Sequence, residues 1–101
     1  MFSLFSLKSK TDKIKEALED GAVIVDVRTP QEFKSGHIKG SINIPLQQLN
    51  SKVDFLKKKE KTIITCCLSG GRSASAKSIL TKHGIPCING GGWGSLNYKL
   101  H

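Results

Sequence analysis

The sequence has little of several features that define whole classes of proteins. Aromatic residues make up only 6% of its 101 residues, and no apolar run approaches the length of a membrane span. The N-terminus, M-F-S-L-F-S-L-K-S-K, lacks a basic leading region, and serines break its short apolar stretch, unlike a secretory signal. Internal repeats, linkers and low-complexity segments are also missing. These absences favour a single globular domain, which we expect to be cytoplasmic.

The cysteine content argues against a disulfide framework and against a metal centre. There are three cysteines, an odd number, whereas a small secreted domain more often carries an even set. Adjacent Cys66 and Cys67 cannot easily bridge each other, which favours a reducing compartment. Because the cysteines and histidines show no paired ligand spacing, we expect no zinc or other metal site.

Acidic residues are scarce relative to basic ones. The chain has eight Asp and Glu residues and sixteen Lys and Arg residues, which gives a formal net charge of +8. A basic balance suggests an anionic partner without identifying it. Half of the excess lies in one short run, Lys57, Lys58, Lys59 and Lys61. Because no aromatic residue is interleaved with this run, a solvated helix end is favoured, and we expect neither nucleic acid nor membrane as a partner.

Apolar runs alternate with helical patterns along most of the chain. Buried strands are predicted at 22–27, 42–44, 62–66 and 86–88. Helices are predicted from a cap at Thr11 or Asp12 up to Gly21, and then at 30–36, 46–59, 73–83 and 95–100. We expect residues 1–10 to form a separate N-terminal segment, which could be an edge strand, a packing arm or a disordered stretch. Strands that alternate with helices favour an α/β fold with a parallel sheet covered on both faces.

The stretch T-I-I-T-C-C-L-S-G-G-R-S carries the strongest chemical signal. A cysteine ends a buried strand, a loop of small residues follows, and a helix is predicted to begin at Ser73. Such a loop, with Gly70 and Gly71, allows several backbone N–H groups to converge on one point. The helix N-terminus and Arg72 would both stabilise a thiolate and lower the pKa of the cysteine, which makes it a nucleophile. The alternative is a buried structural cysteine before an ordinary turn.

Three segments together resemble the signatures of the rhodanese family of sulfurtransferases. Residues 67–73 match its pattern of a cysteine, four residues, an arginine and often a serine. Residues 26–45 resemble its N-terminal signature through D-V-R-T-P, E-F, G-H-I and G-S-I-N-I-P. Residues 84–93 resemble its C-terminal end through N-G-G and Trp93, although the family more often places its aromatic residue a little later. The order and spacing of the three segments make the resemblance specific.

The resemblance implies both a fold and a reaction. The fold would be a three-layer α/β/α domain over residues 11–101, with a central, mainly parallel sheet of about five strands. The Cys67 thiolate would attack the outer sulfur of a small anionic donor such as thiosulfate. The resulting persulfide would pass its sulfur to cyanide or to a thiol acceptor, a small redox protein being one candidate. No cofactor is implied. The residues that bind the substrate would be Leu68, Ser69, Gly70, Gly71, Arg72 and Ser73.

Two charged residues at the end of the first buried strand are expected to support the site. A charged residue in such a place is usually paired. We expect Asp26 to hold neighbouring backbone and Arg28 to pair with Glu32. Arg28 could instead add positive potential to the site.

Cys66 offers a second interpretation of the same loop. Counted from Cys66, the spacing is a cysteine, five residues and an arginine, which is that of the cysteine phosphatases and arsenate reductases that share this fold. We favour Cys67 as the nucleophile because Cys66 continues the strand pattern, and because Cys67 stands at the strand end where the family places its nucleophile. A third interpretation is a domain that delivers sulfur to a partner protein or docks on it.

Overall fold

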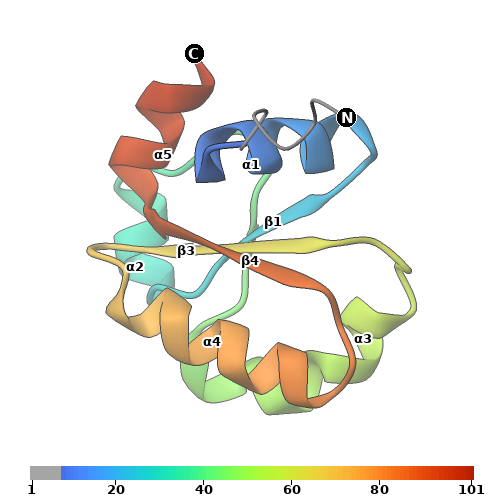
Figure 1. The fold of residues 1–101 in the computed structure, drawn as a ribbon. Helices are drawn as coiled ribbons and strands as arrows, with labels where there is room; N and C mark the ends of the chain where they lie inside the picture. The colour runs from blue at the N-terminus through green and yellow to red at the C-terminus, as the bar shows by residue number, and fades with distance from the viewer. Residues whose placement is uncertain (1–7) are drawn as a thin grey trace, which may run out of the picture.

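The computed structural model describes residues 8–101, which form a parallel four-stranded sheet with helices on both faces (Figure 1). The strands stand in the order β2-β1-β3-β4, and every neighbouring pair is parallel. Their bounds are β1 Val23–Asp26, β2 Ile42–Asn43, β3 Ile63–Cys67 and β4 Cys87–Gly92. The α/β/α architecture is confirmed, but the sheet has four strands rather than about five. The N-terminal segment that we considered as an edge strand lies, up to residue 7, outside the described residues.

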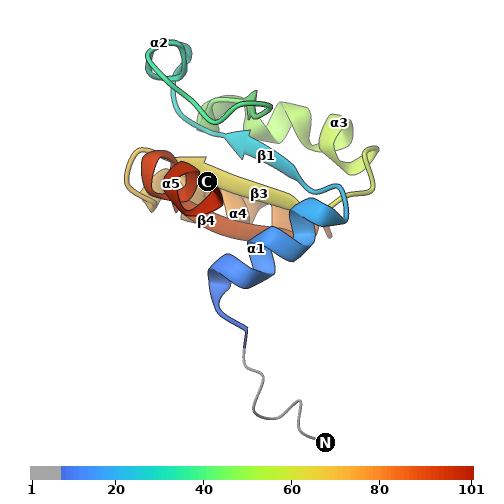
Figure 2. The same cartoon turned by 90° about the horizontal axis from the view of Figure 1, so that it is seen from above.

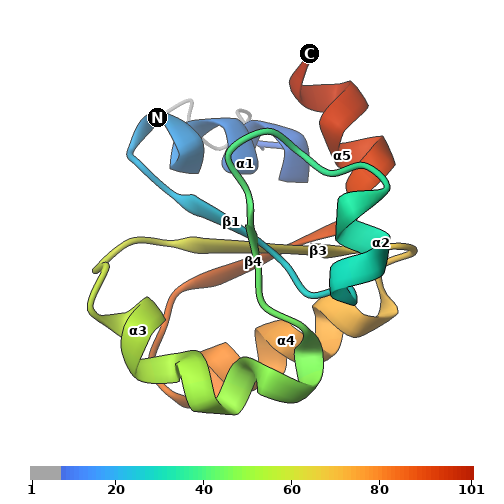
Figure 3. The same ribbon diagram turned by 180° about the vertical axis from the view of Figure 1, so that it is seen from behind.

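The helices form a layer on each face of the sheet. Helices α1 (Lys10–Glu19) and α5 (Trp93–Leu100) cover one face (Figure 1). The other face is covered by α3 (Val53–Lys57), α4 (Gly71–Lys82) and the 3-10 helix η2 (Leu46–Lys52). The short helix α2 (Pro30–Lys34) lies beyond the carboxyl end of β1 (Figures 2 and 3). Among the helices of residues 8–101, none combines the length and the apolarity of a membrane-spanning segment.

Each face of the sheet has its own buried apolar cluster, because successive side chains of a strand point to opposite faces. The cluster under α1 and α5 consists of Ile14, Ile24, Ile38, Ile64, Cys66 and Leu96. The cluster under α3 and α4 consists of Val25, Val27, Ile44, Leu49, Val53, Leu56, Ile63, Cys67, Ala76, Leu80 and Ile85. The two adjacent cysteines therefore lie in different layers of the core.

Helix boundaries differ from the predicted ones where a side chain caps the helix. Helix α1 is capped by Ser9, whose hydroxyl accepts the N–H of Asp12 while the Asp12 carboxylate accepts the N–H of Ser9. The expected caps, Thr11 and Asp12, thus lie inside the helix instead. A reciprocal pair of this kind satisfies two N–H groups that a helix start leaves free, which explains the earlier beginning.

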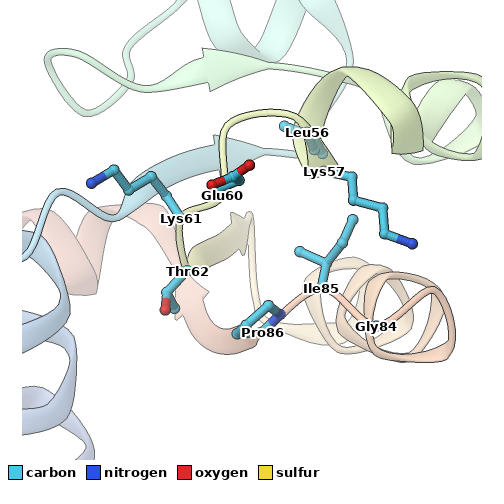
Figure 4. Close-up of a pocket in the computed structure, with 8 residues that line it drawn as sticks. All are labelled: Leu56, Lys57, Glu60, Lys61, Thr62, Gly84, Ile85 and Pro86. Atoms are coloured by element: carbon cyan, nitrogen blue, oxygen red, sulfur yellow. The ribbon is translucent and has the colours of Figure 1, made fainter.

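A pocket of about 280 Å³ opens at the amino ends of β3 and β4 (Figure 4). Lys57 and Lys61 line it, but the carboxylate of Glu60 lies there too, so the pocket is not uniformly cationic. The remaining lining residues are Leu56, Thr62, Gly84, Ile85 and Pro86. Cys67 is at the carboxyl end of β3. The lysine run therefore lies at the opposite edge of the sheet from the predicted nucleophile.

Gly90 lies where β4 passes closest to β3 and α5. A Cβ atom here would be 2.8 Å from the Thr65 carbonyl oxygen and 2.9 Å from Leu96 Cδ2. Because backbone must shift to make room, we expect Gly90→Ala to lower the free energy of unfolding by about 1–3 kcal/mol, measured in urea. Gly94→Ala in α5 is the control, since its Cβ would meet nothing within 4 Å. Equal stability of the two variants would contradict the close packing at Gly90.

Candidate active site

Cys67 is the last residue of β3, and the loop after it turns back toward the cysteine sulfur. Gly70 has a φ of +107°, in the left-handed region that favours glycine, and α4 begins at the next residue. The turn brings the amide nitrogen of Gly70 to 3.0 Å from Cys67 Sγ. The amide nitrogen of Ser73, in the first turn of α4, lies 3.3 Å from the same sulfur. Two main-chain N–H groups thus point at one sulfur atom.

This arrangement favours a thiolate although the sulfur is enclosed. Burial alone would raise the pKa of Cys67, because a charged group loses solvation in the core. Hydrogen bonds that a thiolate can accept here, from the Ser73 hydroxyl once it turns toward the sulfur and from the amides of Ser73, Gly70 and Ser69, outweigh this cost, so the pKa lies below its ordinary value. A lower pKa supplies more thiolate near neutral pH, and the thiolate is the nucleophilic form.

The predicted nucleophile, Cys67, is less accessible than a solvent-facing thiol would be. Cys67 exposes only 1% of its surface, and its side chain belongs to the core cluster under α3 and α4. Leu68, the next residue along the loop, is 60% exposed. A sulfur so enclosed favours reaction with a small molecule over direct contact with a bulky one.

Arg72 binds a carboxylate instead of pointing at the sulfur. Its Nη1 and Nη2 donate to Glu32 Oε1 at 2.8 Å and Oε2 at 3.1 Å. These hydrogen bonds from Arg72, together with one from the Thr29 amide, lower the pKa of the Glu32 carboxyl to about 2. Glu32 also completes the capping box that starts α2 at Thr29. Arg72 therefore ties the start of α4 to the first turn of α2, and Glu32 already neutralises its charge.

Arg28 pairs with Asp26 and not with Glu32, so the predicted ion pair was wrong. Both partners are buried, and Arg28 Nη2 lies 2.8 Å from Asp26 Oδ2. The physical reason is that the Glu32 carboxylate is occupied by Arg72 and Thr29, while Arg28 reaches only the Glu32 backbone carbonyl, at 3.1 Å. Asp26 also binds neighbouring backbone, since its Oδ1 accepts the backbone N–H of Arg28 at 3.0 Å.

Trp93 covers the buried pair at the end of β1. The guanidinium carbon of Arg28 lies 4.7 Å from the centre of the indole ring, within the range of a cation–π contact. The same ring packs over Gly36, where a Cβ atom would come within 3.0 Å of it. Gly36 in turn accepts a hydrogen bond from Arg28 Nη2 at 2.7 Å through its carbonyl oxygen. These contacts hold both ends of the segment 28–36, which contains α2 and Glu32.

Cys66 lies on the other face of the sheet and is fully buried among apolar residues. Burial, with a smaller contribution from the charge of Asp26, raises the pKa of its thiol to about 12. A thiol of this kind stays protonated near neutral pH and is a poor nucleophile. The geometry therefore favours Cys67 over Cys66 for any chemistry of this loop. Within residues 8–101, no group of three or more His, Cys, Asp or Glu side chains is placed to hold a metal ion.

Two residues of the site were not identified from the sequence by role. Glu32 had been assigned to Arg28, and Asn89 had entered only as part of a family signature. Asn89 Oδ1 accepts hydrogen bonds from the Ser73 hydroxyl at 2.7 Å and from the Gly91 amide at 2.9 Å. Only the T-P-x-E capping pattern signalled that Glu32 lies at a helix start. No local signal indicated that either side chain reaches the start of α4, because both contacts join distant parts of the chain.

Removal of the buried carboxylate tests the support at the end of β1. Asp26→Asn leaves the Arg28 guanidinium buried without its charge partner, so we expect the free energy of unfolding to fall by about 3–5 kcal/mol in denaturant titrations. Asp54→Asn, at an exposed position in the first turn of α3, makes the same chemical change and should cost no more than about 0.5 kcal/mol. A small, similar loss in both variants would show that the buried pair is not needed.

The chain is similar to known proteins in sequence. A family model described as a rhodanese-like domain matches residues 10–95. The chain is 32% identical over 69 residues to the thiosulfate sulfurtransferase PspE of Escherichia coli (strain K12), covering 67% of this chain and 66% of PspE. It is 38% identical over 69 residues to the thiosulfate sulfurtransferase GlpE of Pseudomonas syringae, covering 66% of this chain and 62% of GlpE. The chain thus spans slightly less than two thirds of the length of these two relatives.

The fold is similar to that of solved structures as well. The crystal structure of a rhodanese-like domain protein from Staphylococcus aureus matches with a TM-score of 0.72 and 29% sequence identity, over 86% of each chain. The family match spans most of the chain, including β1, β3 and the loop after Cys67. On these grounds the chain belongs to the family of rhodanese-like domains, which among the relatives above includes sulfurtransferases.

Proposed function

We propose that this protein is a sulfurtransferase that moves a sulfane sulfur from a small anionic donor such as thiosulfate to cyanide or a thiol, through a persulfide on Cys67. The observation that carries the proposal is the convergence of the Gly70 and Ser73 amides on Cys67 Sγ, at 3.0 and 3.3 Å. Fixed N–H groups of this kind stabilise negative charge on sulfur without rearrangement during the reaction. The family relationship supports the same chemistry.

The reaction needs no external oxidant or reductant. In the first step the Cys67 thiolate attacks the outer sulfur of thiosulfate, the bond between the two donor sulfurs breaks, and sulfite leaves with the electron pair. In the second step cyanide or a thiolate attacks the terminal sulfur of the persulfide, and the Cys67 thiolate is released. Each step exchanges one sulfur–sulfur bond for another bond to sulfur. The chemistry requires neither a metal nor an organic cofactor.

The loop residues take distinct roles in this proposal. The amides of Ser69, Gly70 and Ser73 hold the charge of the sulfur, and Leu68 stands exposed beside it. Gly71 begins the helix whose first turn carries Ser73. Arg72 orients the start of α4 through Glu32, and the Asp26–Arg28 pair holds the end of β1. Donor binding thus depends more on main-chain N–H groups than on a free arginine.

The alternatives differ in which chemistry they require. A phosphatase or arsenate reductase based on Cys66 needs a thiolate on the apolar face under α1 and α5, where burial raises the thiol pKa to about 12. Release of phosphate from an aryl phosphate would favour that alternative. A sulfur-delivery or docking domain would share the Cys67 persulfide and differ in its acceptor. The cytoplasmic location stays a prediction; all three cysteines are free thiols, as a reducing compartment would keep them.

Intact mass after treatment with thiosulfate tests the assignment of the nucleophile. Wild type and Cys66→Ala should gain the mass of one sulfur atom, which cyanide then removes, because Cys67 remains in both. Cys67→Ser should gain nothing, since a serine hydroxyl cannot form the persulfide. Cys66→Ala is the matched control, because it removes the adjacent thiol without placing a polar group in the apolar cluster. A gain in mass that survives Cys67→Ser would assign the reaction to another residue.

The left-handed turn at Gly70 can be tested apart from its general effect on stability. Gly70→Ala strains the backbone and redirects the amide that faces Cys67 Sγ, so we expect the rate of persulfide formation to fall by about tenfold to a hundredfold. Gly84→Ala is the control, because Gly84 has a φ of +77° with nothing within 4 Å of an added Cβ, at the amino end of β4. Both variants should lose about 1–2 kcal/mol of unfolding free energy. Equal rates of persulfide formation in the two variants would show that the reaction does not depend on the turn at Gly70.

A further inference from the structure

The Ser73 hydroxyl lies between the catalytic sulfur and β4. Its Oγ is 3.5 Å from Cys67 Sγ, which donates to it, and it donates in turn to Asn89 Oδ1 at 2.7 Å. The Gly70 carbonyl oxygen, at 3.0 Å, is a second and longer acceptor. Asn89 Oδ1 also accepts the N–H of Gly91 at 2.9 Å. Because an amide nitrogen could not accept from Gly91, this contact fixes which end of the Asn89 side chain faces Ser73.

The hydroxyl has a single hydrogen, so it cannot donate to Asn89 and to Cys67 at the same time. While Cys67 is a thiol, the network is satisfied, because sulfur donates to Ser73 and Ser73 donates to Asn89. Once Cys67 is a thiolate, its sulfur can only accept. The Ser73 hydroxyl must then turn toward the sulfur and give up Asn89, or else leave oxygen lone pairs facing a negative charge.

We propose that Asn89 is a positioning residue for Cys67: by holding the hydrogen of the Ser73 hydroxyl, it keeps an oxygen lone pair toward the sulfur and favours the thiol over the thiolate. The inference takes from the proposed function only that Cys67 is the reacting group. Asn89 contacts neither the sulfur nor a substrate in this account. It acts entirely through the orientation of Ser73.

Asn89 and the Cys67 thiolate compete for the hydrogen of the Ser73 hydroxyl, and this competition affects both half-reactions of the sulfur transfer. A more basic thiolate is a better nucleophile and a poorer leaving group. Asn89, by opposing ionisation, therefore makes each Cys67 thiolate a better nucleophile and a poorer leaving group, while it lowers the fraction of Cys67 that is ionised at a given pH. In the persulfide Sγ carries no net charge, and the hydroxyl returns to Asn89. Each change of partner is a rotation of the Ser73 hydroxyl and transfers no atom.

The charged groups nearest to Cys67 are paired with one another, and the adjacent thiol is buried. On α4, Arg72 is paired with Glu32, and this contact raises the pKa of Arg72 and lowers that of Glu32 to about 2. On β1, Asp26 and Arg28 neutralise each other in a buried pair. On β3, the Cys66 thiol stays protonated, since burial raises its pKa to about 12. A pH profile of Cys67 modification near neutral pH therefore reports its own ionisation.

The test is a double-mutant cycle read out by alkylation, which needs no sulfurtransferase activity. The rate at which iodoacetamide modifies Cys67 is followed against pH by peptide mass spectrometry, which separates Cys67 from Cys66 and Cys87. Asn89→Ala should lower the midpoint pH by roughly half a unit to one unit, because the Ser73 hydroxyl is freed for the thiolate. In a Ser73→Ala background the same substitution should shift nothing. A merely structural role for Asn89 would disturb Cys67 in both backgrounds.

The proposal is overturned if Asn89→Ala shifts the midpoint pH of alkylation equally in the Ser73→Ala background. It is also overturned if Asn89→Ala causes no shift while Ser73 is present. Should Asn89→Ala fail to fold by circular dichroism, Asn89→Asp replaces it and keeps an acceptor for Ser73 and Gly91. The carboxylate holds the hydroxyl more strongly and adds negative charge, so the midpoint should rise more with Ser73 present than in the Ser73→Ala background. An equal rise in both backgrounds also overturns it. If thiosulfate forms no persulfide on Cys67, the proposed function is refuted. The double-mutant cycle can still be interpreted in that case, because alkylation does not require sulfur transfer.

Discussion

The proposed chemistry of this protein depends on one constraint, the need to hold negative charge on a sulfur, Cys67 Sγ, that is almost completely enclosed. The core around Cys67 is apolar, and such surroundings penalise a thiolate. The penalty is offset by N–H groups that converge on the sulfur, and their convergence depends on a left-handed turn at Gly70. The rest of the site can be understood as the set of contacts that keeps this turn in place.

Those contacts come from two strands and a helix. The Thr65 hydroxyl of β3 donates to the Ser73 carbonyl at 3.0 Å, Asn89 of β4 binds the Ser73 hydroxyl, and Glu32 of α2, the helix that follows β1, binds Arg72. The first turn of α4 is therefore held on several sides. A parallel sheet makes this possible, because all its strands end at the same edge. Main-chain geometry at Gly70 and side-chain contacts from the sheet thus support the same few atoms.

The sequence was informative wherever the determining contacts are local. Continuous β-branched runs predicted β1 and β3, and the strand pattern placed Cys66 in the sheet before the loop. That the two thiols lie on different faces became clear only from the structure. Glycine at position 70 signalled the tight turn. The partners of Arg28 and Arg72 were assigned wrongly or left open, because spacing along the chain does not say which of several carboxylates a long side chain reaches. Asn89 and Ser73 are 16 residues apart and meet only because β4 lies beside β3.

The two arginines beside the site add little net charge to it. Arg72 and Arg28 are each neutralised by a carboxylate, and the run at Lys57–Lys61 lies at the other edge of the sheet. Main-chain dipoles stabilise an anion at one point but attract it weakly from a distance, whereas a free cation would act over about 10 Å at ordinary ionic strength. A sulfur carrier gains from this difference, because it must release an anionic product such as sulfite and keep its own anionic persulfide. A site built from N–H groups favours charge on the bound sulfur and does not retain the anion that leaves.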